Sequence, residues 1–263
     1  MRPSELKEIA WRANRALARS GLVMGTFGNV SAVDRSHGVF AIKPSGVPYG
    51  RLAAKDMVVV SLESGRVVAG KLRPSSDTPT HLALYLAFPS IGGIVHTHSE
   101  YATTFAQAGE PIRCMGTTHA DYFHGDVPIT RALRQPEIEA DYEMNTGGVI
   151  VETFTDRRLS PEEMPAVLVA HHGPFTWGRD PFEAIHHAQA LEYVARLEWR
   201  VRTLNPDAQR PAACLVDKHH RRKHGPSAYY GQGKDTKGTK DTKGTKDAKE
   251  RRDATERRDA KER

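Results

Sequence analysis

The chain has 263 residues, of which 38% are hydrophobic and 27% are charged. No apolar run approaches the roughly 20 residues that a membrane-spanning helix needs, and residues 1–20 have the pattern of a charged amphipathic helix rather than of a signal peptide. The two cysteines, Cys114 and Cys214, fit neither a disulfide framework nor a thiolate zinc motif. We therefore expect a cytoplasmic protein whose body is one α/β domain.

The net positive charge is concentrated at the C-terminal end. Residues 233–263 contain 12 Lys and Arg against 8 Asp and Glu, whereas residues 1–232 contain 26 against 24. The end segment repeats Lys-Asp-Thr-Lys-Gly-Thr and has no apolar residue larger than alanine, so it cannot form a core. The sequence predicts a folded domain over residues 1–232 and a disordered tail over 233–263. We expect no nucleic-acid or membrane partner, because a solvated tail of mixed charge explains the basic balance better.

The first predicted element is an amphipathic helix that starts near Ser4 and ends before Gly21. The apolar residues at helical spacing are Leu6, Ile9, Ala10, Ala13 and Leu17. Its apolar face requires a sheet to pack against. The candidate strands are residues 39–42, 57–62, 67–68, 94–98, 149–152 and 167–170, with a Ser64-Gly65 turn between the second and the third.

Three further helices are predicted from their start signals. Pro79 suits the first turn of a helix that continues to Phe88, and Ser99 suits the cap of a helix that runs towards Gln107. Asp180, followed by proline and glutamate, predicts a longer helix. Regular βαβ alternation and glycine-rich nucleotide motifs are absent. We therefore expect a single α/β domain with a mixed or largely antiparallel sheet covered by helices on both faces.

Histidines at the ends of two apolar runs indicate a metal site. His96 and His98 follow the run 91–95, and side chains two apart on a strand share one face. The run 166–170 ends in His171-His172, and Asp77 lies in an acidic turn upstream. Three imidazoles and one carboxylate suit a catalytic divalent ion of the zinc type better than a closed structural site.

Six short motifs occur in order along the chain. They are Thr26-Phe27-Gly28-Asn29-Val30-Ser31, Lys43-Pro44-Ser45-Gly46, Ser75-Ser76-Asp77-Thr78-Pro79-Thr80-His81, Val95-His96-Thr97-His98, Gly116-Thr117-Thr118-His119-Ala120-Asp121-Tyr122 and His172-Gly173-Pro174. With the segment Ala228-Tyr229-Tyr230-Gly231-Gln232, they resemble the class II sugar-phosphate aldolase and epimerase family, and within it the L-ribulose-5-phosphate 4-epimerases. The resemblance covers essentially residues 1–232.

The resemblance implies roles for individual residues. It assigns the metal, usually zinc with manganese or cobalt as alternatives, to four ligands, which are Asp77, His96, His98 and His172. Only one of two adjacent histidines in an extended chain can face the metal, which leaves His171 a structural or supporting role. Asp121 and Tyr230 are implied to transfer protons, with Tyr230 contributed by a neighbouring subunit of a fourfold symmetric homotetramer.

The implied reaction interconverts L-ribulose 5-phosphate and D-xylulose 5-phosphate. The hydrogen on carbon 4 is not adjacent to the carbonyl and is not acidic, so simple deprotonation is difficult. Breaking and reforming the bond between carbons 3 and 4, a retro-aldol route, avoids this problem, with the metal as Lewis acid. The expected substrate-binding residues, which would hold the phosphate, are Gly28, Asn29, Lys43, Ser45, Gly46, Ser75 and Ser76.

Two alternative functions remain open at this point. An L-fuculose- or L-rhamnulose-phosphate aldolase uses the same chemistry, but such enzymes typically carry Glu where this chain has Asp77. An adducin-like interaction module keeps the fold without a full set of metal ligands. Thr117 and His219 are weaker site candidates, and the run His219–His224 is otherwise interpreted as a basic surface.

Overall fold

The structure is a computed structural model that describes residues 1–224 and 228–229. Tyr230 and the predicted tail over residues 233–263 lie outside the described residues. None of the helices in the described part combines the length and the apolar character of a membrane-spanning segment.

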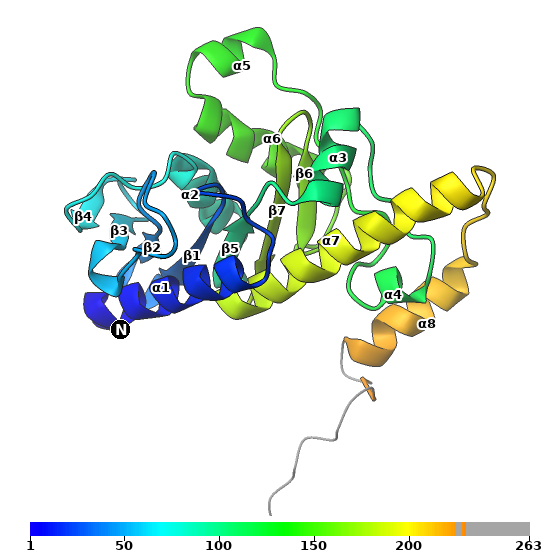
Figure 1. The fold of residues 1–263 in the computed structure, drawn as a ribbon, viewed down its shortest axis with the longest axis horizontal. Helices are drawn as coiled ribbons and strands as arrows, with labels where there is room; N and C mark the ends of the chain where they lie inside the picture. Colours follow the sequence, from blue (N-terminus) through cyan, green and yellow to red (C-terminus); the bar gives the residue numbers. More distant parts are fainter. Residues whose placement is uncertain (225–227, 230–263) are drawn as a thin grey trace, which may run out of the picture. The chain divides into compact units, whose positions relative to one another are not determined.

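A seven-stranded sheet forms the centre of the fold, in the order β4-β3-β2-β1-β5-β7-β6 (Figure 1). Every neighbouring pair in it is antiparallel, which confirms the prediction of a largely antiparallel sheet. The strands are β1 (Asn29–Asp34), β2 (Val39–Ile42), β3 (Val58–Ser61), β4 (Val67–Ala69), β5 (Gly93–His96), β6 (Ala166–Val169) and β7 (Gly173–Gly178). In the register that places the site, Asn29 of β1 lies opposite His96 of β5.

Helices cover both faces of the sheet, as the sequence predicts. They are α1 (Pro3–Arg19), α2 (Thr78–Ala87), α3 (Glu100–Ala108), α4 (Thr117–Ala120), α5 (Gln135–Glu139), α6 (Tyr142–Asp156), α7 (Pro181–Leu204) and α8 (Ala213–Lys223), with short 3₁₀ turns η1 (Arg35–His37) and η2 (Ala54–Asp56). The helices α1 and α7 pack on one face, whereas α2 and α6 pack against each other on the other (Figure 1).

The core follows from the alternation of side chains along the strands. Phe40 and Ile42 of β2 point to the face covered by α2, where the largest apolar cluster lies. Ala41, between them, points to the opposite face and packs with Leu6 and Ala10 of α1. The four helices predicted from start signals, α1, α2, α3 and α7, are present, and Asp180 caps α7 by accepting hydrogen bonds from Phe182 and Glu183.

The predicted strand over residues 149–152 is wrong, because these residues lie in the middle of α6. Their β-branched side chains favour a strand locally. Asp141 nevertheless caps a helix by accepting a hydrogen bond from the amide of Met144, and α6 packs closely on α2. At Gly147 an added Cβ would lie 2.6 Å from Cβ of Ala83, so glycine permits this close approach. Tertiary packing overrides the local preference.

Candidate metal centre

Three of the predicted histidines converge at one end of the sheet. His96 is the last residue of β5, His98 follows two residues later, and His172 lies in the turn between β6 and β7. One ring nitrogen from each lies within 4.8 Å of the others. The Nε2 atoms of His96 and His98 are 3.1 Å apart. The predicted strand over residues 94–98 therefore ends early, but its two histidines still meet.

Neighbouring groups fix the orientation of these rings. Nδ1 of His96 donates to the carbonyl oxygen of Pro174 at 3.0 Å, so its Nε2 carries the lone pair. The same ring stacks on Phe175 with centroids 4.2 Å apart. Nδ1 of His172 lies 3.3 Å from the hydroxyl of Tyr142, the first residue of α6. Such partners of the distal ring nitrogen are typical of metal-binding histidines.

The adjacent His171 is placed differently. It is exposed, its φ of 61° lies in the left-handed region, and its amide donates to the carbonyl oxygen of Ala106. This conformation turns the chain between β6 and β7, so that only His172 joins the cluster of three imidazoles. His171 thus occupies the turn rather than the cluster.

The surroundings of two of these histidines, His98 and His172, favour the neutral form. Burial and the neighbouring His96 and His98 lower the pKa of His172 to about 3. Burial, with a further contribution from His96, also lowers the pKa of His98. Neutral imidazoles offer lone pairs, which is the state that metal binding requires. The arrangement fits a divalent cation, because the three ring nitrogens lie close enough together to bind one ion.

Asp77 supplies a negative charge beside the histidines. It precedes α2, and its Oδ2 accepts a hydrogen bond of 2.6 Å from Nδ2 of Asn29. Burial raises the pKa of Asp77, but His96, His81, the Asn29 hydrogen bond and His172 outweigh it and lower the pKa overall. Asp77 is not one of the three residues whose ligand atoms lie within 4.8 Å of one another. Its electrostatic interactions with His96 and His172 show that it lies near them.

The residues predicted to hold phosphate lie on three loops around Asp77. Ser75 Oγ accepts from Nδ2 of Asn29 at 3.1 Å, and the amide of Ser75 donates to the carbonyl oxygen of Lys43. A bridge between Pro44 and Pro74 brings the segments 43–46 and 73–76 together. Ser45, Gly46 and Ser76 are exposed there. Gly28 has a φ of 77°, and a Cβ on it would lie 2.9 Å from the carbonyl oxygen of His96.

Lys43 is buried rather than solvated. Its Nζ donates to the carbonyl oxygens of Thr26 and Pro44 and lies 4.9 Å from the ring centre of Tyr49. Burial lowers the pKa of Lys43, whereas the nearby Asp77 opposes that shift. An ammonium group with few strong partners near an open polar loop is suited to pairing with an anion.

Asp121 is placed by α8. Its carboxylate accepts hydrogen bonds from Nε and Nη2 of Arg222 at 3.0 and 2.6 Å, and His219 Nδ1 lies 3.2 Å away. Burial raises the pKa of Asp121, but the hydrogen bonds from Arg222 and His219 and the charge of Lys223 lower it overall. The basic run 219–224 is thus largely a helix paired with Asp121, rather than a free basic surface. Thr117 is the first residue of α4.

Sequence analysis did not single out Tyr142 or His81. His81 is fully buried, its Nδ1 lies 2.7 Å from the hydroxyl of Ser31, and its Nε2 has no hydrogen-bond partner within the described chain. Tyr142 directly follows Asp141, which caps α6. An aspartate at this position is a helix start signal that could have pointed to Tyr142. His81 had a weaker signal, its presence in the motif that contains Asp77.

Several solved structures are similar to this chain in fold. The chain is 24% identical to an L-fuculose 1-phosphate aldolase, with a TM-score of 0.69 and coverage of 83% of this chain and 95% of that one. It is 27% identical to YgbL from Klebsiella pneumoniae, a putative aldolase/epimerase/decarboxylase, with a TM-score of 0.66 and coverage of 84% and 100%. An L-fuculose 1-phosphate aldolase from Glaciozyma antarctica PI12 is 19% identical, with a TM-score of 0.68 and coverage of 86% and 84%.

The family model described as "Class II Aldolase and Adducin N-terminal domain" matches residues 8–199. This range contains every strand of the sheet and the three converging histidines. The chain therefore belongs to the class II aldolase and adducin family.

Proposed function

We propose that this protein is a metal-dependent epimerase that interconverts L-ribulose 5-phosphate and D-xylulose 5-phosphate by breaking and reforming the bond between carbons 3 and 4. The convergence of three imidazoles beside the ionised Asp77 carries the proposal, because it provides a cation site in a member of a sugar-phosphate family. The epimerase motifs around Asp121 and at 228–232 favour this reaction over cleavage alone.

His96, His98, His172 and Asp77 would hold the metal, for which we propose zinc, with manganese or cobalt as alternatives. When bound, the ion supplies Lewis-acid stabilisation of the negative charge that develops on the substrate, a contribution of several kcal/mol. Asn29 and Tyr142 orient two of these ligands, Asp77 and His172, through the hydrogen bonds described above.

The phosphate of the substrate is assigned to the loops that contain Gly28, Ser45, Gly46, Ser75 and Ser76. These loops present backbone amides and hydroxyls, and the bridge between Pro44 and Pro74 keeps two of them adjacent. Asn29, behind them, positions Asp77, and the buried Lys43 provides the positive charge.

Asp121 and Tyr230 are assigned to proton transfer at the carbon 4 oxygen, one on each face of the aldehyde fragment. Arg222 and His219 keep the carboxylate of Asp121 ionised, so that it is ready to accept a proton near neutral pH. Tyr230 lies outside the described residues, and we assign it to the site of a neighbouring subunit in a homotetramer. A fully active monomer would contradict this assembly.

Class II aldolase activity on L-fuculose 1-phosphate is the second candidate. The observation in its favour is that two of the similar solved structures are named as L-fuculose 1-phosphate aldolases. Incubating metal-loaded protein with L-ribulose 5-phosphate, and assaying both D-xylulose 5-phosphate and free aldehyde, separates the two. Inverted pentose phosphate supports the epimerase, whereas release of aldehyde without inversion supports an aldolase. Absence of bound divalent metal would favour an adducin-like module instead.

A further inference from the structure

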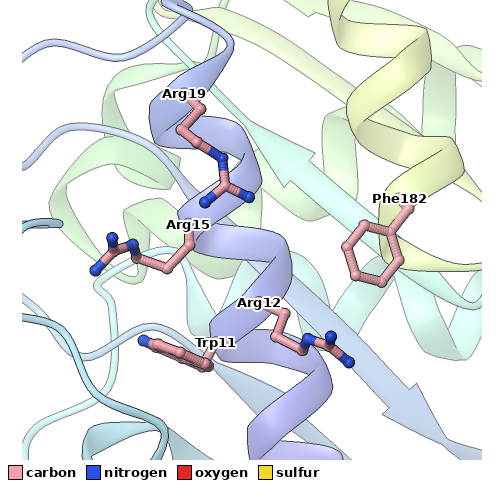
Figure 2. A pocket seen from close by; sticks show the side chains of 5 residues that line it. All are labelled: Trp11, Arg12, Arg15, Arg19 and Phe182. Atoms are coloured by element: carbon pink, nitrogen blue, oxygen red, sulfur yellow. The ribbon is translucent and has the colours of Figure 1, made fainter.

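A hollow with a volume of about 500 Å³ lies between α1 and the start of α7 (Figure 2). Five residues line it, and they are Trp11, Arg12, Arg15, Arg19 and Phe182. None of them belongs to the proposed metal, substrate or proton-transfer residues. Three arginines among five lining residues, with no acidic residue, make this hollow strongly cationic.

Helix geometry explains why these side chains lie together. At 100° per residue, the four lining residues of α1 fall within an arc of about 100°. Leu6, Ala13 and Leu17 lie on the opposite side of the helix and are buried against the sheet. An outward face of this kind is expected to be polar, but exposed helix faces normally mix both signs of charge. Glu8 also lies on this outward face, but the residues that line the hollow itself carry only positive charge.

The arginines have no partners in the part of the chain that the structure describes. Arg12, Arg15 and Arg19 make no ion pair there, and Glu8, one turn before Arg12 on the same face, does not pair with it. Acidic groups near Phe182 are already engaged, since Asp180 caps α7 and Glu183 pairs with Arg179. Three like charges within about 10 Å along a helix repel each other, which an anionic ligand would offset.

Aromatic side chains flank the cationic groups. Phe182 is 47% exposed, although it lies in the first turn of a helix with a well-packed inner face. Trp11 is held by a hydrogen bond of 2.7 Å from Nε1 to the carbonyl oxygen of Leu52. Figure 2 shows Arg12 on the side of α1 that faces Phe182, and Trp11 with Arg15 on the other side. Guanidinium groups match phosphate oxygens, and exposed phenyl rings stack on flat rings.

We propose that this hollow binds a nucleoside di- or triphosphate, with its phosphates on Arg12, Arg15 and Arg19 and its base against Phe182. The volume is within the range of small-ligand sites. A long nucleic acid is less well matched, because residues 1–232 contain 26 basic against 24 acidic residues and so offer little further attraction. The proposal is independent of the reaction at the metal centre.

The test is calorimetric titration of the full, metal-loaded chain with ATP, ADP, tripolyphosphate and adenosine in 150 mM salt with excess Mg²⁺. ATP and ADP should bind saturably with one site per chain, and adenosine should not bind. Arg15→Gln should weaken ATP binding about tenfold, because it removes charge-assisted hydrogen bonds. Arg200→Gln, on an exposed position of α7, is the matched control and should leave the affinity unchanged.

A second substitution separates the two halves of the ligand. Phe182→Ala should weaken ATP binding several-fold and leave tripolyphosphate binding unchanged, since only the base contacts the ring. Three results would overturn the proposal. The first is that ATP shows no saturable binding below 1 mM. The second is ATP binding that survives Arg15→Gln but disappears in His98→Asn. The third is that a single-stranded RNA of about 12 nucleotides binds more tightly than ATP and loses its binding in Arg15→Gln. The second would place ATP at the metal centre, and the third would make the hollow a nucleic-acid interface.

Discussion

Asn29 donates a hydrogen bond of 2.6 Å to Asp77, and in the sheet it lies directly opposite His96. One strand residue therefore joins the carboxylate of the proposed metal site to β5, which ends in one of its histidines, His96. The Oδ1 atom of Asn29 is buried without a hydrogen-bond partner in the described chain, so the amide is oriented by its Nδ2 contacts to Asp77 and Ser75.

Removing this link should weaken the metal site without removing a ligand. Asn29→Ala is expected to lower zinc affinity about 10- to 100-fold, as is typical when a group that orients a ligand is lost. The measurement is competition against a chelator of known affinity. Asn205→Ala, an exposed position after α7, serves as the control. Unchanged affinity in Asn29→Ala would mean that Asp77 is not a ligand or needs no support.

Loss of a ligand itself should have a larger effect. His96→Asn and His98→Asn are each expected to reduce both bound metal and turnover, and chelation should abolish turnover, because the imidazoles converge within 4.8 Å of each other. Metal content is measured by elemental analysis alongside activity. His171→Asn, at the exposed neighbour of His172, should retain metal. Full activity in verified metal-free protein would contradict the mechanism.

The proton-transfer residues should behave differently from the ligands. Asp121→Asn and Tyr230→Phe are expected to retain metal while turnover falls roughly 100- to 10,000-fold. Mixing an inactive Tyr230→Phe variant with an inactive His98→Asn variant should restore part of the activity if neighbouring subunits share a site. Solvent deuterium at carbon 4 of the product would rule out the carbon–carbon cleavage route, in which that hydrogen stays on its carbon.

The contact of Asp121 with Arg222 and His219 of α8 should set the pH dependence of turnover. Although burial opposes it, Arg222 and His219 hold the pKa of Asp121 below its ordinary value, so the carboxylate stays ionised, and able to act as a base, down to low pH. Arg222→Gln removes two hydrogen bonds to this carboxylate and should raise that pKa. The acidic limb of the pH–rate profile is then expected to move to higher pH. A profile that keeps its acidic limb would indicate that Asp121 is not the titrating base.

Truncation after Gln232 should leave turnover and oligomeric state unchanged. Residues 233–263 follow the last family motif and contain no apolar residue larger than alanine, so they have no means of packing. Activity assays and light scattering of the shortened chain provide the measurement. A large loss of activity would show that the boundary of the catalytic domain lies beyond residue 232.

Sequence patterns predicted the strands with apolar runs, but β1 was missed. Its residues Asn29, Ser31 and Asp34 are polar yet buried, because each has an internal partner: Asp77 for Asn29, His81 and Tyr85 for Ser31, and the N-terminal amine for Asp34. The alternation of polar and apolar residues runs only from Asn29 to Ala32 and breaks at Val33, which is too short a pattern to mark a strand. β7 was missed for a related reason, since it begins with Gly173 and Pro174, which are typical of turns.

In the candidate site, too, some features were predictable from the sequence and others were not. The histidine pair was visible because residues two apart on a predicted strand share a face. The strand ends at His96, and the structure still brings the two rings together. The contact between Asp121 and Arg222 of α8 joins residues 101 positions apart through an ion pair and its hydrogen bonds. No periodicity marks that helix, whose last turn is His220, Arg221, Arg222 and Lys223. Only the three-dimensional structure shows that Arg222 and Lys223 of this turn face Asp121.

The close contact between α2 and α6 has a consequence for the site. Asp77 lies at the start of α2 and Tyr142, which contacts His172, at the start of α6, and the hydroxyl of Thr80 donates to the carbonyl oxygen of Glu143 between them. The distance between Asp77 and Tyr142 therefore depends on how closely α2 and α6 pack, and Gly147 permits their close approach at Ala83. A side chain added at Gly147 would spread the two helices and widen the mouth of the site without touching any residue that lines it.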